Sequence, residues 1–272
     1  MNSEREPTRT RRESSFSDAM LAAVDIGNTN IVLALRDNGK WISTFRVFTD
    51  AKKTGDEYYA IFSSLLRETG IDCTLVDKAI ISSVVPFLTR SIEKNMERLF
   101  GIKPLIVSKE LETGLDKSSI PEELGSDLLC NLAYSHSLYP DKNAMTVDFG
   151  TALTFSTVSR EGKVLGVAIA PGLITAVNAL FGSTAKLPQV ELKVPDSVLG
   201  RNTEDSVRSG IMHGFSGLVN EMIRKTEEEI GEDITVIATG GLSATISSLI
   251  PRIDRIDGLH TLKGLALISD LN

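Results

Sequence analysis

Val24-Asp25-Ile26-Gly27-Asn28-Thr29-Asn30 lies between two apolar runs, residues 21–24 and 31–35. This arrangement predicts the tight turn of a β-hairpin. Gly27 lets the backbone approach a ligand closely because it has no Cβ, and the polar residues after it offer backbone N–H groups that can cradle an anion. Asp25 ends a strand that we expect to be buried, where a carboxylate needs a cation or hydrogen-bond donors nearby. Taken alone, the stretch is explained more simply as an ordinary hairpin turn.

A second copy of the pattern favours a ligand site. Met145-Thr146-Val147-Asp148-Phe149-Gly150-Thr151 repeats the order apolar strand, Asp, apolar residue, Gly and Thr, and a strand-like run follows at residues 154–158. Two such hairpins predict a duplicated fold with a nucleotide bound between its halves. Each copy is only a few residues long, so coincidence is the alternative.

Composition limits the classes of protein that fit. The chain has 272 residues, 42% of them apolar, which is enough for one large domain or two smaller ones. Its net charge of −7 argues against a general binder of nucleic acid or of membrane surfaces and suits a small-molecule enzyme. No apolar run is long enough to cross a bilayer. The two cysteines, Cys73 and Cys130, form no CxxC pair and fit a reducing cytosol as packing residues.

Local signals divide the chain into three parts. Residues 1–19 are charged and polar, so we expect a disordered extension. Met20 precedes the first strand, and the extension is interpreted either as sequence upstream of the native start or as a regulatory tail. Residues 20–143 and 144–272 are predicted to be two similar α/β halves.

Each half begins with a three-stranded meander and continues with helices and buried strands. The first half is predicted to have strands at 21–25, 31–36, 41–47, 78–82 and 105–107, and helices at 54–68 and 86–100. The second half is predicted to have strands at 146–148, 154–158, 164–168 and 234–238 and a surface loop at 185–201. Its predicted helices are one that follows Pro171-Gly172 and runs to about residue 181, and three more at 203–230, 242–249 and 261–271.

A set of short motifs resembles one known family, the type III pantothenate kinases, over residues 21–272. The motifs are Asp25-Ile-Gly-Asn-Thr-Asn, Gly125-Ser-Asp127, Asp148-Phe-Gly-Thr151, Ala170-Pro-Gly172, Gly200-Arg-Asn-Thr203, Thr239-Gly-Gly241 and Thr261-Leu-Lys-Gly264, in the order seen in that family. The resemblance implies duplicated ribonuclease H-like halves, as in actin-like ATPases, with a central nucleotide cleft. It also implies a cytoplasmic homodimer that transfers the γ-phosphoryl group of ATP to pantothenate, the first step of coenzyme A synthesis.

The resemblance assigns roles to individual residues, and phosphoryl transfer needs such positioning and charge neutralisation. Asp127 matches the general base, Asp148 matches the ligand of a monovalent cation (K⁺ or NH₄⁺), and Asp25 would orient hydrated Mg²⁺. The implied ATP-binding residues are Asp25, Ile26, Gly27, Asn28, Thr29, Asn30, Ile31, Val32, Thr151, Gly240 and Gly241. The implied pantothenate-binding residues are Gly125, Ser126, Asp127, Leu128 and Thr203.

Each assignment has a structural alternative. Asp127 suits the first turn of a helix, where a carboxylate is favourable, and without the resemblance this is the better interpretation. Thr203 is an adequate helix N-cap, Asp148 suits a turn, and Gly240-Gly241 suits an ordinary strand-to-helix turn. The histidines, His136, His213 and His260, are scattered and receive no catalytic role, with the first two expected on helices.

Two departures from the family pattern concern the phosphoryl acceptor. The family places an arginine after the base, where this chain has Leu128, and a tyrosine upstream that residues 114–121 lack. Leucine can neither pair with a carboxylate nor donate a hydrogen bond, and losing such a charged contact costs roughly 1.5–3 kcal/mol. Lys117 is a candidate substitute charge. The sequence therefore leaves three hypotheses: a pantothenate kinase with altered acceptor recognition, a kinase of another small hydroxyl compound, and a non-catalytic nucleotide-binding accessory protein.

Overall fold

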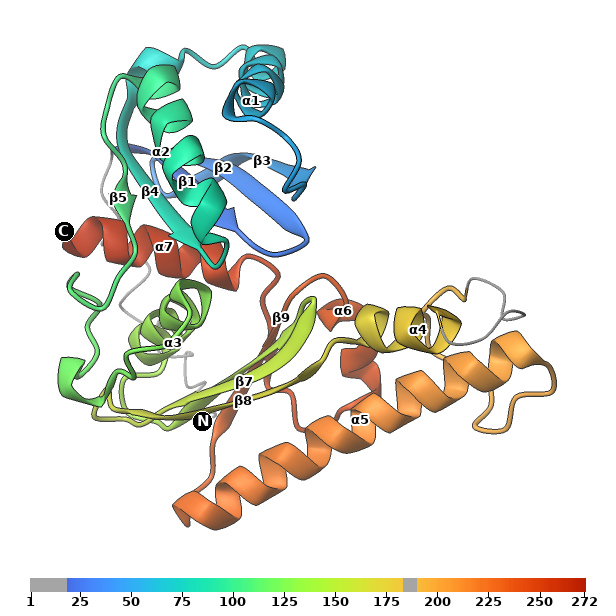
Figure 1. The fold of residues 1–272 in the computed structure, drawn as a ribbon. Coiled ribbons are helices and arrows are strands. Elements are labelled where there is room, and N and C mark those ends of the chain that lie inside the picture. The colour runs from blue at the N-terminus through green and yellow to red at the C-terminus, as the bar shows by residue number, and fades with distance from the viewer. Residues whose placement is uncertain (1–18, 183–189) are drawn as a thin grey trace, which may run out of the picture.

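The hairpin around Gly27 is present and begins the first of two mixed β-sheets (Figure 1). The structure is a computed structural model and describes residues 19–182 and 190–272. The extension predicted at residues 1–19 therefore falls outside the described residues except for its last position. Within the described part of the chain, no helix is both long enough and apolar enough to cross a membrane.

The first sheet has the strand order β3-β2-β1-β4-β5. Its strands are β1 (Met20–Ile26), β2 (Asn30–Asp37), β3 (Lys40–Phe48), β4 (Val76–Ser83) and β5 (Leu105–Ile106). The predicted meander forms β1 to β3, which are antiparallel, and β4 then pairs with β1 in parallel. Parallel pairing needs a crossover connection, and α1 (Gly55–Thr69) supplies it between β3 and β4.

Local sequence signals set the ends of the two helices that cover the outer face of this sheet. α1 begins where Thr54 and Glu57 form a reciprocal capping box and ends at Gly70, which has a left-handed backbone. α2 (Pro86–Phe100) begins with proline in its first turn and ends at Gly101 in the same left-handed conformation. Both helices pack on one face of the sheet, with Phe62 and Ile92 among the buried contacts.

The second sheet repeats this plan with the order β10-β9-β6-β7-β8. Its strands are β6 (Ala144–Phe149), β7 (Ala152–Val158), β8 (Val164–Pro171), β9 (Thr235–Thr239) and β10 (Arg255–Ile256). The predicted second meander forms β6 to β8, and β9 pairs with β6 in parallel. The long helix α5 (Thr203–Ile230) packs on one face of this sheet through Met212, Val219 and Ile223, and α4 (Leu173–Gly182) contacts α5 (Figure 1). Two five-stranded sheets with the same plan confirm the predicted duplicated α/β fold.

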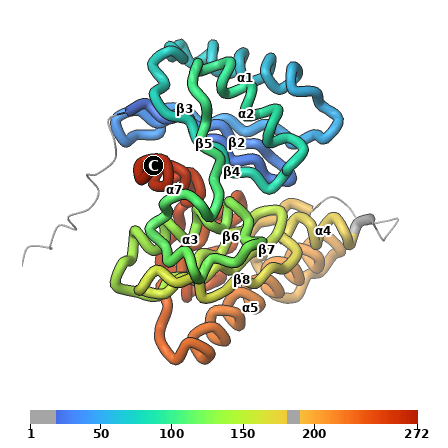
Figure 2. The backbone as a smooth tube through the Cα atoms, turned by 60° about the vertical axis from the view of Figure 1, so that its left-hand side comes forward, coloured from blue at the N-terminus to red at the C-terminus, as the bar shows by residue number. Residues whose placement is uncertain are grey.

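A layer of two helices lies between the sheets. α3 (Ser126–Leu138) packs on β6 and β7, whereas α7 (His260–Leu271), which follows the second half in sequence, packs on β1 and β4 (Figures 1 and 2). The two helices also pack on each other, and a Cβ on Gly264 would lie only 2.2 Å from the Cys130 carbonyl oxygen. Glycine is therefore required where α7 crosses α3, and one apolar cluster joins the inner faces of both sheets.

Some predicted elements are shorter, shifted or capped differently. The helix predicted at 242–249 is a four-residue helix, α6 (Ser243–Ile246), followed by the 3₁₀ helix η3 (Ser247–Leu249). Two further 3₁₀ helices, η1 (Cys73–Leu75) and η2 (Lys117–Ser119), and the short strand β10 were not predicted. The prediction of Thr203 as an N-cap is wrong, because Asn202 caps α5 by accepting a hydrogen bond from the Asp205 N–H at 2.8 Å. The loop predicted at 185–201 has no helix or strand at residues 190–201, and its beginning lies outside the described residues.

Candidate active site

The turns of the two duplicated hairpins meet between the sheets. The Oγ1 atoms of Thr29 and Thr151 are 2.6 Å apart, although 122 positions separate these residues in sequence. In the first turn, the Gly27 N–H donates to the Asn30 carbonyl at 2.9 Å, and the Thr49 hydroxyl donates to the Gly27 carbonyl at 2.7 Å. Two polar turns are thus held opposite each other, as a ligand bound between the halves requires.

Strand register gives the two hairpin carboxylates equivalent places. Asp25 pairs with Val32 on one side and Ser82 on the other, and Asp148 pairs with Thr154 and Thr239. Side chains two residues apart on a strand share a face, so Asp25 shares its face with Ala23, which packs in the cluster between the sheets. Both carboxylates therefore face the inner layer that contains α3 and α7.

The start of α3 brings a third carboxylate to this place. The Ser126 hydroxyl donates to the Ser83 carbonyl at 3.0 Å and accepts from the Ser83 N–H at 2.8 Å. These bonds attach the first residue of α3 to the end of β4. That strand pairs with β1, which carries Asp25. Asp127 follows in the first turn, where its Oδ1 accepts from the Leu128 N–H at 2.8 Å. A Cβ at position 125 would lie 2.6 Å from this oxygen, so Gly125 leaves the room that Asp127 needs.

The three carboxylates repel one another. Burial, followed by the charge of Asp127, raises the pKa of Asp25 to about 7, against smaller opposing effects of the Ser82 hydroxyl and Arg46. Burial and the charge of Asp127 likewise raise the pKa of Asp148 to about 7, and the Asn131 amide opposes that rise. Burial also raises the pKa of Asp127, against backbone N–H donors. Nearby cations would favour the charged forms of all three.

The carboxylates of this site suit a metal ion that keeps most of its waters better than one held by protein ligands alone. Among residues 19–182 and 190–272, no three His, Cys, Asp or Glu side chains are close enough to hold a metal ion together. Mg²⁺ commonly keeps several waters and binds through one or two carboxylates plus substrate phosphates. Asp25 beside a phosphate-sized turn matches that mode, and Asp148 supplies a second, separate anionic position.

A glycine after β9 belongs to the same site. Gly240 has φ = 88°, a conformation that favours glycine, and a Cβ here would lie 2.4 Å from Asp148 Oδ1. A Cβ on Gly241 would meet no atom within 4 Å. Of the predicted Gly240-Gly241 pair, Gly240 is thus the member required beside Asp148.

The other predicted binding residues differ in how much of their side chain a ligand could reach. The side chains of Ile26 and Ile31 are buried in the core beneath α1 and α2, so these residues can offer a ligand only their backbone. Asn28 is exposed at the turn, and Leu128 is buried at 7% exposure. Lys117 does not replace the missing charge in this structure, because it pairs with Glu112 at 3.4 Å on the surface.

Thr203 lies elsewhere. It lines a cavity of about 630 Å³ between the end of α4 and the start of α5. Figures 1 and 2 both place α4 and this end of α5 away from α3. The residues lining the cavity are Leu180, Gly200, Arg201, Asn202, Thr203, Ser206, Val207, Gly210 and Ile211. Within one chain, the structure therefore does not bring Thr203 together with Asp127.

Two features of the site were missed in the sequence. Arg46 pairs with Val32 in register and so extends the row of Asp25 across the first sheet. Among residues 19–182 and 190–272, it is the cation that lowers the pKa of Asp25. The alternating pattern of the strand around Arg46 indicates which face of the sheet this side chain is on. It does not indicate the register across three strands, which places Arg46 in the row of Asp25.

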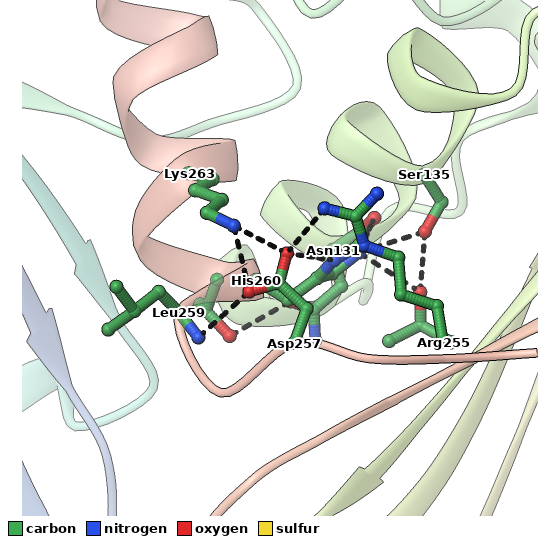
Figure 3. Close-up of polar contacts among 9 residues, drawn as sticks. Asn131, Ser135, Arg255, Asp257, Leu259, His260 and Lys263 are labelled. Atoms are coloured by element: carbon green, nitrogen blue, oxygen red, sulfur yellow. Dashed lines mark hydrogen bonds and ion pairs between the residues drawn. The ribbon is translucent and has the colours of Figure 1, made fainter. Parts of the chain in front are cut away.

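The second missed feature is a polar network at the start of α7 (Figure 3). His260 is fully buried, and its Nε2 lies 2.9 Å from the Ser135 hydroxyl and 3.2 Å from the Asn131 carbonyl. Lys263 donates to both carboxylate oxygens of Asp257, at 2.9 and 2.7 Å. The predicted helical placement of His136 and His213 is confirmed, on α3 and α5.

Comparison with known proteins gives one consistent family. A sequence model described as type III pantothenate kinase matches residues 21–225. The type III pantothenate kinase of Finegoldia magna is 41% identical over 257 residues, which cover 93% of this chain and 98% of that protein. That of Moorella thermoacetica is 39% identical over 254 residues, covering 93% and 100%.

Solved structures with low sequence identity support the fold alone. A Campylobacter jejuni protein described as a conserved putative Baf family transcriptional activator is 18% identical with a TM-score of 0.58, covering 91% of this chain and 96% of that one. A ROK family glucokinase from Streptomyces griseus, solved with glucose and AMPPNP, is 12% identical with a TM-score of 0.54, covering 93% and 99%.

Proposed function

Because this chain belongs to the type III pantothenate kinase family, it is an ATP-dependent kinase of pantothenate, and we propose that three carboxylates divide the work of phosphoryl transfer. The observation that carries this proposal is the meeting of Asp25, Asp127 and Asp148 beside two facing hairpin turns. Kinase chemistry also uses a divalent metal ion, which neutralises the phosphate oxygens when it is bound.

Asp127 is proposed to accept the proton of the pantothenate primary hydroxyl. The hydroxyl oxygen then forms the new bond to the γ-phosphorus, and the bond to the β-phosphate oxygen breaks, which releases ADP. A general base works best when its pKa is near the working pH, and burial moves the pKa of Asp127 in that direction. Its place in the first turn of α3, fixed by Ser126 against β4, holds the carboxylate in position.

The hairpins are proposed to hold ATP. Residues 25–32 would bind its phosphates through backbone N–H groups and the side chains of Asn28, Thr29 and Asn30, with Thr151 contributing from the second turn. Asp25 would hold Mg²⁺ through water. Asp148 would bind a monovalent cation, K⁺ or NH₄⁺, which would offset the burial and the Asp127 charge that together raise the pKa of this carboxyl. Gly240 and Gly241 would admit the adenosine end of the nucleotide.

We propose a homodimer in which a second copy completes the acceptor site. Thr203 lies away from Asp127 in one chain, so the two could contact the same pantothenate only across a dimer. Large apolar side chains are exposed on β8, on α4 and just before α5, as an interface would require: Ile169, Ile174, Leu180, Val198 and Leu199. Sedimentation of the wild type and of Ile169→Asp tests this, since the variant should be monomeric and inactive. We also propose that the enzyme works in the cytoplasm.

The decisive experiment measures ATP-dependent phosphorylation of pantothenate with Mg²⁺ and either K⁺ or Na⁺. We expect 4'-phosphopantothenate, formed faster with K⁺. Asp127→Asn should abolish turnover while ATP still binds, and unchanged turnover would remove Asp127 from the mechanism.

A kinase of another acceptor is the second candidate, favoured by Leu128, which is buried beside the base. Leu128→Arg should lower the KM for pantothenate about tenfold if a charged contact is what the chain lacks. If the wild type forms no product, other hydroxyl compounds become the substrates to test. If all of them fail while ATP binds, a non-catalytic accessory role becomes the better explanation.

A further inference from the structure

A stripe of polar residues runs along the face of α3 that looks toward α7. Asp127, Asn131 and Ser135 are spaced by four residues, which places them on one side of a helix. Asn131 and Ser135 are fully buried. Since four residues of an α-helix rise about 6 Å, Asn131 lies one turn behind the proposed base, deep in the layer between the sheets.

Helix α7 fixes the orientation of the Asn131 amide. The Thr261 hydroxyl donates to Asn131 Oδ1 at 2.9 Å, and the close crossing of Gly264 over Cys130 holds the two helices at this separation. With the oxygen of the amide engaged by Thr261, its nitrogen must point the other way. Nδ2 is buried and has no partner within hydrogen-bonding distance among the described residues. A buried donor left without a partner destabilises the folded protein.

The group beside that nitrogen is the Asp148 carboxylate. The Ser135 and Thr146 hydroxyls are 2.6 Å apart where α3 packs on β6. Asn131 lies one helical turn before Ser135, and Asp148 lies two strand residues after Thr146, so both are on these same facing surfaces. The amide accordingly lowers the pKa of Asp148, whereas burial and Asp127 raise it. Asp148 also lies against Gly240, whose missing Cβ leaves the carboxylate its room.

We propose that Asn131, held by Thr261, is a positioning residue that donates a hydrogen bond to Asp148 and aims this carboxylate at the monovalent cation. This inference rests on the proposed role of Asp148 as the cation ligand. Partners that orient a metal ligand influence metal binding strongly, and their loss commonly costs 10- to 100-fold in affinity or activity. The same turn of α3 would then fix the geometry of both Asp127 and the cation.

The test compares two conservative changes at Thr261. Thr261→Val removes the hydroxyl, whereas Thr261→Ser keeps it, so only the first should free the Asn131 amide. We expect Thr261→Val to raise the K⁺ concentration for half-maximal activity roughly fivefold to tenfold, as for a lost hydrogen bond. Asn131→Ala should raise it by roughly 10- to 100-fold, and Thr261→Ser should match the wild type.

A second readout does not depend on turnover. The midpoint of thermal unfolding is measured against K⁺ concentration with the non-hydrolysable analogue AMPPNP and Mg²⁺ present. The K⁺ needed for half of the stabilisation should shift as in the activity assay. Ser135→Ala is the matched control, because Ser135 is equally buried on α3 and contacts His260 of α7. It should lower the unfolding temperature without changing the K⁺ requirement.

The outcomes separate this inference from the proposed function. A wild type that responds to K⁺, with Thr261→Val and Asn131→Ala both keeping the wild-type K⁺ requirement, overturns the inference alone. An equal change in Ser135→Ala also overturns it, because the effect would then be general loosening of α3. A wild type indifferent to monovalent cations in both assays overturns the proposed role of Asp148 and this inference with it, while the kinase activity stands on its own assay.

Discussion

Replacing Asp148 by asparagine should stabilise the ligand-free protein at pH 8. The carboxylate is partly buried beside Asp127, and burial followed by that charge raises its pKa from 3.8 to about 7. Asparagine has nearly the same shape and can accept the same hydrogen bonds, but it carries no charge. The substitution therefore removes the repulsion while keeping the packing around Gly240.

The sign and size of the effect follow from the pKa. A carboxyl whose pKa is higher in the folded state binds more protons there, so its stabilising contribution is fully present below pH 3.8 and is lost as the pH rises through about 7. At 1.36 kcal/mol per pKa unit, this rise corresponds to about 4 kcal/mol over the whole window. Asp148 keeps some contact with solvent, so we expect about half of that, roughly 2 kcal/mol.

Urea unfolding at pH 5 and pH 8 measures the effect. Tetramethylammonium should be the only added cation, because K⁺ or Mg²⁺ would bind the folded state and stabilise it. The free energy of unfolding of Asp148→Asn should exceed that of the wild type by about 2 kcal/mol at pH 8, and the excess should be clearly smaller at pH 5.

A partly exposed aspartate, away from the three carboxylates, provides the control. Asp116 accepts hydrogen bonds from Ser118, chiefly from its hydroxyl, and these lower the pKa of its carboxyl, so Asp116→Asn should give no gain at pH 8. An Asp148→Asn protein that is less stable than the wild type at pH 8, or equally shifted at both pH values, would refute the reasoning.

Three further substitutions probe the rest of the structure. Arg46 extends the row of Asp25, so we expect it to pair with a phosphate of ATP, a charged contact worth about 1.5–3 kcal/mol. Arg46→Met should then raise the ATP dissociation constant roughly tenfold by calorimetry, with Arg46→Lys recovering part of the loss. Gly240→Ala should destabilise by about 2–4 kcal/mol in urea, because its φ is 88° and its Cβ would lie 2.4 Å from Asp148 Oδ1; Gly241→Ala should not. Asp270→Ala removes the carboxylate 2.9 Å from the buried Arg36 guanidinium and should cost about 3 kcal/mol of unfolding free energy; adding Arg36→Met should recover part of it.

Features with local signals could be predicted from the sequence. The two Asp-x-Gly turns, the capping box at Thr54 and the Pro86 and Gly101 boundaries of α2 all depend on neighbours within a few residues. The predicted hairpins and duplicated sheets are confirmed for this reason. The predicted roles of Asp25, Asp127 and Asp148 rest on the resemblance. The structure adds that, besides burial, the charge of Asp127 raises the pKa values of Asp25 and Asp148.

Features that depend on distant contacts or on close competition could not be predicted. Asn202 and Thr203 are both good N-cap residues, and only the geometry of the helix start selects the first. In the broken helix after Gly240, the Ser243 hydroxyl donates to the Gly240 carbonyl at 2.7 Å, a local bond that competes with regular helix formation. The burial of His260 depends on α3, more than 120 positions away, so its own neighbours carry no signal of it.

The exchange of helices between the halves has a consequence for biosynthesis. β4 ends at Ser83, whereas α7, which covers the inner face of β1 and β4, begins at His260. A ribosome must therefore translate the whole second meander and α5 before the first half can bury that face. Until then the nascent chain exposes Leu21, Ala23 and Ile80. Exposed apolar surface of this kind makes a partly folded chain prone to aggregation and a substrate for chaperones. Folding of the first half during translation should consequently stall before completion, so that both halves reach their native state together.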